Sequence, residues 1–135
     1  MKHLLLPSLV LLASLTFAQK PHRIVMQFSS GDSLSQASVL GQVRNIRTEW
    51  PDARIEVVCH GPGLDLLTSA GSRIPAATMA DWKSKGVVFA ACQNTMRRRG
   101  VKAEDLLREA TMVPSAMTEL VLKQEEGWSY VKGGH

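Results

Sequence analysis

Apolar residues in this chain fall into two kinds of stretch. Five short runs contain β-branched or aromatic residues and end at glycine, proline or small polar residues, which is typical of strands. Between them lie longer stretches in which apolar residues recur every three or four positions, which predicts helices. The expected strands cover residues 22–28, 54–60, 87–91, 110–114 and 128–132.

The longest expected helix follows the first strand. Residues 33–36 have the capping-box pattern of a hydroxyl residue followed three positions later by glutamine, and Pro51 ends the segment. Its predicted inward face consists of Ala37, Leu40, Val43, Ile46 and Trp50. Shorter helical segments are expected at 64–67, from Pro75 to Gly86, from Asn94 or Thr95 to Arg99, at 103–108 and at 116–126, the last capped by Ser115 with Leu120 and Val121 facing inward.

Strands and helices alternate along the chain, which predicts a mainly parallel sheet between two helical layers, a three-layer α/β/α fold. The third strand is apolar at every position, as in a parallel strand covered on both faces. The last strand alternates large apolar and polar residues, so we expect it at an edge of the sheet.

The first 18 residues have a different character. Met1-Lys2-His3 is followed by an apolar run, and Thr16-Phe17-Ala18 supplies small residues at the first and third positions. This pattern predicts a secretory signal peptide cleaved before Gln19. We therefore expect a single mature domain at 19–135, periplasmic or secreted, with no membrane span after cleavage.

Composition narrows the classes of partner. The net charge of +4 permits contact with anions. Only 5% of residues are aromatic, and no RNA- or DNA-reading motif occurs, so we do not expect nucleic-acid binding. The sequence contains no phosphate-binding loop or dinucleotide fingerprint, and we expect no cofactor.

Cys92 is the first candidate for chemistry. It follows the third strand, and ligands of open α/β sheets bind at the carboxyl ends of strands. Gln93, Asn94 and Thr95, which lead into the next helix, are candidate ligand-binding residues. The amides and positive end of that helix favour a thiolate or a bound sulfur anion, as do the arginines at 97–99. The alternative is a small, inert, buried side chain.

The second strand ends in a second group of candidates. Cys59 also ends a strand, and in an oxidising compartment it can pair with Cys92 or resolve it; otherwise it is a buried strand residue. His60 is a candidate proton carrier or a residue that orients Cys92, or it bonds only to backbone. Gly61 and Gly63 either present amides to an anion or form a tight turn. No close-spaced ligand motif supports a metal site.

Six segments of the sequence are familiar in combination: Cys59-His60-Gly61-Pro62-Gly63-Leu64, Phe89-Ala90-Ala91-Cys92-Gln93-Asn94-Thr95-Met96, Arg99-Gly100, Glu104-Asp105-Leu106-Leu107, Val113-Pro114-Ser115 and Gln124-Glu125-Glu126-Gly127-Trp128-Ser129-Tyr130. Together they resemble the DsrE/DsrF-like family over residues 22–132. The resemblance implies a flavodoxin-like domain with a five-stranded parallel sheet, and a tendency to form homo-oligomers.

Better-studied members of that family carry sulfur as a cysteine persulfide, and Cys92 stands where the family has its cysteine. The resemblance therefore implies a sulfur carrier that exchanges sulfur with a donor or acceptor protein, assisted by His60 and the Asn94-Thr95 helix start. Two alternatives stay open. One is a non-catalytic oligomer that binds a small anion or a protein, and the other is a redox protein that cycles a Cys59–Cys92 disulfide.

Overall fold

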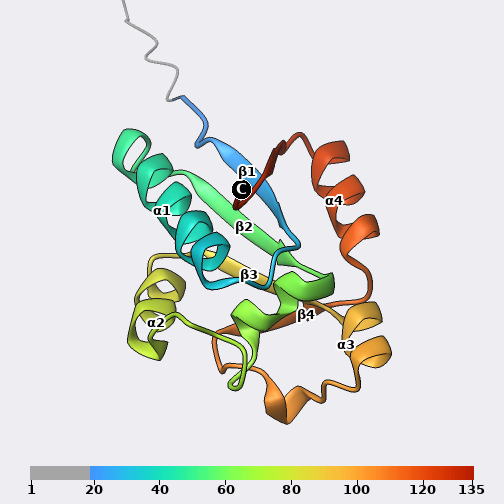
Figure 1. The fold of residues 1–135 in the computed structure, drawn as a ribbon. Coiled ribbons are helices and arrows are strands. Elements are labelled where there is room, and N and C mark those ends of the chain that lie inside the picture. Colours follow the sequence, from blue (N-terminus) through green and yellow to red (C-terminus); the bar gives the residue numbers. More distant parts are fainter. Residues whose placement is uncertain (1–18) are drawn as a thin grey trace, which may run out of the picture.

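A computed structural model describes residues 19–135 (Figure 1). The predicted signal peptide lies outside the described residues. All five expected strands are present: β1 (Arg23–Phe28), β2 (Arg54–Cys59), β3 (Val88–Cys92), β4 (Ala110–Val113) and β5 (Ser129–Lys132). They form one sheet in the order β4-β3-β2-β1-β5, and every neighbouring pair is parallel. The expected α/β/α fold is confirmed, with β5 at an edge.

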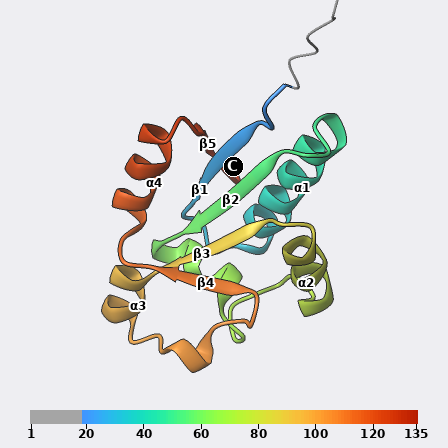
Figure 2. The same cartoon turned by 180° about the vertical axis from the view of Figure 1, so that it is seen from behind.

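The helices lie on both sides of this sheet (Figures 1 and 2). The α-helices are α1 (Ser33–Glu49), α2 (Ala76–Ser84), α3 (Gln93–Arg99) and α4 (Ala116–Glu125), and the 3₁₀ helices are η1 (Gly61–Leu67) and η2 (Ala103–Asp105). From β1 to β4 the chain moves stepwise across the sheet, and α4 then returns it to β5 beside β1. Because parallel crossovers are right-handed, this reversal places α4 on the face opposite α1.

Two apolar cores follow from this arrangement. The larger lies under α1, α2 and η1 and contains alternate residues of the strands, among them Met26, Val57 and Phe89. The smaller lies under α4 and contains Val58, Ala90 and Cys92, together with Val25, Ala116 and Leu120. The side chains of a strand alternate between faces, so β1, β2 and β3 each contribute buried residues to both cores. Within residues 19–135, no helix is long and apolar enough to cross a membrane.

The start and the inward face of α1 differ from the prediction. Asp32 caps the helix by accepting a hydrogen bond from the Ser35 backbone at 2.9 Å. Gln36 is fully buried and ties down the loop at 71–73, donating to Gly71 O at 3.1 Å and accepting from Arg73 N at 2.8 Å. Because Asp32 and not Ser33 is the N-cap, Gln36 is not at the N3 position and the predicted capping box does not form.

The buried residues of α1 include Leu40 and Val43 of the predicted inward face, together with Ser35, Gln36 and Val39, which the prediction omitted. Ala37 is exposed. Trp50 is 43% exposed and stacks on His22. Two of the five predicted inward positions were therefore wrong, whereas Ile46 packs against the larger core as predicted; Trp50 lies outside the helix, which ends at Glu49.

Other predicted helix limits and buried positions also differ from those in the structure. The segment at 103–108 is helical only over η2, and Val121 of α4 is 52% exposed while Leu120 is buried. Pro75 is the N-cap of α2 and not its first helical residue. Val88 is 38% exposed, so β3 is not covered along its whole length. Cys92 itself is the N-cap of α3, ahead of the predicted Asn94 or Thr95.

Candidate functional site

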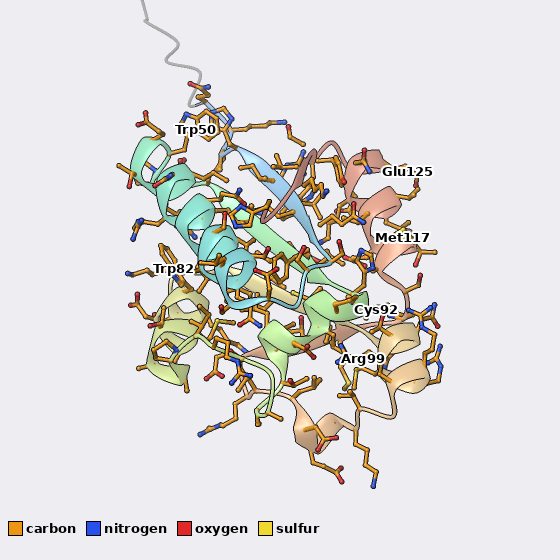
Figure 3. All side chains as sticks on the ribbon, in the orientation of Figure 1. Trp50, Trp82, Cys92, Arg99, Met117 and Glu125 are labelled. Atoms are coloured by element: carbon orange, nitrogen blue, oxygen red, sulfur yellow. The ribbon has the colours of Figure 1, made fainter. Side chains whose placement is uncertain are left out.

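Cys92 lies at the carboxyl edge of the sheet, on the face covered by α4. Its side chain is 4% exposed and packs with the smaller core. It immediately precedes α3. Its sulfur also accepts a hydrogen bond, at 3.3 Å, from the backbone amide of Ala116, which is the first residue of α4. Figure 3 shows Cys92 between Met117 of α4 and Arg99 of α3. The thiol therefore lies where two helices begin.

This position changes the acidity of the thiol. Burial works against ionisation, but hydrogen bonds outweigh it and lower the pKa of Cys92 below its usual range. The donors are the backbone amides of Thr95, Ala116 and Asn94 and the hydroxyl of Thr95. Amides at helix starts stabilise a thiolate because they carry the positive end of the helix dipole. The lowered pKa of Cys92 favours its thiolate, which is the form of cysteine that reacts as a nucleophile.

A small pocket opens beside this sulfur. It has a volume of about 240 Å³ and is lined by His60, Cys92, Asn94, Thr95, Arg98, Ser115, Ala116 and Met117. No aspartate or glutamate is among these lining residues, whereas Arg98 supplies a full positive charge. The pocket thus combines a nucleophilic sulfur with a positive electrostatic environment and room for a small group.

His60 is brought to the same pocket from the end of β2. Burial, with a smaller contribution from the nearby Arg98 charge, lowers the pKa of His60, so its ring is neutral near neutral pH. Its Nε2 lies 2.9 Å from Nε2 of Gln27 on β1. The side-chain oxygen Oε1 of Gln27 in turn accepts a hydrogen bond from the hydroxyl of Tyr130 on β5.

Thr95 connects the two halves of the site. Its side chain is 1% exposed, and its hydroxyl oxygen accepts a hydrogen bond from the Gly61 amide at 3.0 Å. The amide of Gly63 is also occupied, because it donates to the His60 carbonyl at 3.0 Å. Neither glycine lines the pocket. Gly61 and Gly63 therefore form the tight turn that the sequence left as an alternative to anion binding.

The structure does not bring Cys59 to the pocket. Cys59 pairs in register with Ala91, the residue before Cys92, so the two cysteine side chains project to opposite faces of the sheet. Cys59 belongs to the larger core, is fully buried, and is free, as is Cys92. Burial raises the pKa of the Cys59 thiol far above its usual range. It neither pairs with Cys92 here nor reacts readily.

The other candidates divide between the pocket and its surroundings. Asn94 lines the pocket, and its side-chain oxygen accepts from Arg97. Gln93 points away, with its amide nitrogen 3.9 Å from the sulfur of Met112. Arg99 pairs with Asp65 at 2.6 Å and is directed away from the sulfur. Among residues 19–135, no group of three His, Cys, Asp or Glu side chains could hold a metal ion.

Five residues of the site were missed by the sequence analysis: Gln27, Ser115, Ala116, Met117 and Tyr130. Ala116 and Met117 were detectable in principle, since the helix after β4 begins at the same sheet edge as Cys92. Gln27 is a polar residue within an apolar strand, which is a usable signal. Tyr130 gave no signal because its partner depends on β5 pairing with β1.

Comparisons with known proteins agree with this architecture. Residues 13–132 match the model of the DsrE/DsrF-like family. The protein of unknown function MTH1491 from Methanobacterium thermoautotrophicum is 30% identical with a TM-score of 0.77, over 82% of this chain and 98% of that one. The ychN protein from E. coli has a TM-score of 0.65 at 11% identity, over 84% and 99% of the two chains, and so shares the fold. No curated protein matches. The chain belongs to the DsrE/DsrF-like family.

Proposed function

We propose that this protein handles sulfur by holding it as a persulfide on Cys92. Membership of the DsrE/DsrF-like family suggests a sulfur-related role. The observation that carries the proposal is the hydrogen bond from the Ala116 amide to the Cys92 sulfur, which adds the start of α4 to that of α3. The lowered pKa of Cys92 favours the thiolate without a separate base, which supports the proposal.

The reaction is a transfer of sulfane sulfur from a persulfide or polysulfide donor. The Cys92 thiolate attacks the outer sulfur of the donor, a new sulfur–sulfur bond forms at Cys92, and the donor's sulfur–sulfur bond breaks. The donor leaves as a thiolate and keeps the bonding electron pair, so no external oxidant or reductant is needed. Transfer to an acceptor thiolate is the same step in reverse, and the protein is then a carrier with no net chemistry of its own.

The pocket suits the product of that step. A persulfide is anionic near neutral pH, and Arg98 lines the pocket while no carboxylate does. The added sulfur extends from Cys92 by one atom, which a volume of about 240 Å³ accommodates. His60 and the amides at the start of α3 complete the surroundings.

The export signal and self-association belong to the same proposal. We propose that the mature chain works outside the cytoplasm and meets its donor or acceptor there. Three large apolar side chains of α4, Met117, Val121 and Leu122, are each about half exposed, and Met117 also lines the Cys92 pocket. This supports a homo-oligomer packed on α4. Val121→Lys should then lower the mass measured by sedimentation, and a monomeric wild type would contradict it.

The experiment is intact-mass analysis after incubation with a polysulfide. Wild type and Cys59→Ser should each gain one sulfur atom, which a reductant such as dithiothreitol removes, and Cys92→Ser should gain none. Cys59→Ser is the matched control because it removes the other thiol of the described chain. No adduct on wild type, or an adduct that persists in Cys92→Ser, would refute the carrier role. Unmodified protein that binds a small anion would instead support the binding-module alternative.

A further inference from the structure

A row of polar side chains crosses the sheet on the α4 face, close to its carboxyl edge. It consists of Tyr130 from β5, Gln27 from β1 and His60 after β2, and it ends beside Cys92 of β3. These strands are consecutive in the sheet order β3-β2-β1-β5. The first three side chains are joined by hydrogen bonds, and the last two line one pocket. The row therefore connects a distant edge strand to the reactive sulfur.

The direction of these hydrogen bonds follows from the groups at their ends. The Tyr130 hydroxyl donates to the side-chain oxygen Oε1 of Gln27, which leaves the side-chain NH₂ group of Gln27 facing His60. An amide NH₂ can only donate. The Nε2 atom of His60, 2.9 Å away, must therefore be the unprotonated acceptor. A neutral imidazole carries one proton, so that proton is on Nδ1.

We propose that Gln27 and Tyr130 are positioning residues that hold His60 as its Nδ1–H tautomer, so that His60 acts as a hydrogen-bond donor in the Cys92 pocket. With Nε2 already occupied, the ring has no free lone pair with which to take a proton. The role as donor to an anionic sulfur rests on the proposed function, whereas the tautomer does not.

This assignment changes what His60 contributes. The sequence suggested a proton carrier, but Cys92 is already activated by amides and the Thr95 hydroxyl. What a persulfide anion needs from its pocket is donors and positive charge. His60 through Nδ1–H and Arg98 through its guanidinium are of that kind, and both line the pocket. The ligand class that this set fits is an anionic sulfur species.

The test is the two-bond ¹H–¹⁵N correlation spectrum of the full chain labelled at histidine, recorded where the ring is neutral. The sequence has four histidines, and the His60 signals are those lost in His60→Gln. Wild type should show Nδ1 protonated and Nε2 unprotonated. Gln27→Glu should reverse this, since a carboxylate can only accept and Nε2 must then carry a proton. A wild-type Nε2–H tautomer would overturn the assignment.

Two further variants separate positioning from a general loss of structure. Tyr130→Phe keeps the ring but removes the hydroxyl that fixes the Gln27 amide, and a mixture of the two tautomers is expected. Ser129→Ala on the same strand lies outside the row and should leave the wild-type tautomer unchanged. If Gln27→Glu and Tyr130→Phe both keep the wild-type spectrum, Gln27 and Tyr130 do not position His60.

Sulfur loading of the same samples distinguishes the two proposals. If the tautomer is as expected but wild type takes up no sulfur, the carrier function fails and the positioning of His60 stands. If wild type takes up sulfur but His60 is protonated on Nε2, the carrier function stands and the positioning fails.

Discussion

Cys59 and Cys92 are the same residue type at the ends of neighbouring strands, and they meet opposite environments. Cys59 points into the larger core under α1 and η1, where burial raises its pKa far above the usual range. Cys92 points to the α4 side, where two helix starts lower its pKa. A register offset of one residue, with Cys59 opposite Ala91, separates a thiol whose pKa is raised from one whose pKa is lowered.

The larger core, which contains Cys59, includes a tight contact between η1 and β1. A Cβ at Gly63 would lie 2.4 Å from the Phe28 carbonyl oxygen, and neither backbone can yield cheaply. Gly63→Ala should therefore lower the free energy of unfolding by about 3 kcal/mol, the upper end for overpacking. Urea denaturation measures the change.

Gly61→Ala is the matched control for Gly63→Ala. Gly61 has φ of +53° with no atom within 4 Å of its Cβ position, so the variant meets only backbone strain. That strain costs about 1 kcal/mol. Equal losses in the two variants would mean that η1 is not held tightly against β1 at Gly63.

The two cysteines should differ when each is replaced by serine. Cys59→Ser puts a hydroxyl into an apolar core and should cost about 1–3 kcal/mol of unfolding free energy. Cys92→Ser should cost less than 1 kcal/mol, because the amides that now face the sulfur can donate to the new oxygen. Urea midpoints of the two variants decide this, and the comparison breaks down if Cys92→Ser is the less stable one.

The pKa of Cys92 can be changed by a substitution at Thr95 that leaves both cysteines in place. Thr95→Val removes the hydroxyl that donates to Cys92 and accepts from Gly61. The pKa of Cys92 should rise, and alkylation of Cys92 by iodoacetamide at neutral pH should slow several-fold. Thr95→Ser keeps the hydroxyl and should react like wild type. A Thr95→Val protein with the wild-type rate would show that the hydroxyl does not tune the thiol.

Much of the fold could be predicted from the sequence because short β-branched runs and apolar residues recurring every three or four positions are local patterns. All five strands and their parallel arrangement followed from β-branched runs alternating with helical segments. The failures were places where a tertiary contact overrides local pattern. Gln36 reads as half of a capping box but is buried under the 71–73 loop, and Val121 reads as an inward residue but faces outward.

The site was predictable only in part for the same reason. Cys92, His60, Asn94 and Thr95 lie near one another because the carboxyl ends of parallel strands share one edge. Which face Cys59 takes depends on a register of one residue, which a run such as Val57-Val58-Cys59 leaves ambiguous. The contacts of Gln27 with His60 and Tyr130 require knowing that β5 returns to β1.

The most direct test of the difference between the two thiols is site-resolved alkylation of the native protein as a function of pH. Peptide mass analysis after a brief iodoacetamide pulse gives separate rates for Cys92 and Cys59. Because the pKa of Cys92 is lowered, its alkylation should persist below the pH at which a free cysteine peptide stops reacting, while Cys59 stays unmodified until the protein unfolds. Equal alkylation rates for the two cysteines would contradict this account. So would alkylation of Cys92 that stops at the same pH as that of the free cysteine peptide, or at a higher pH.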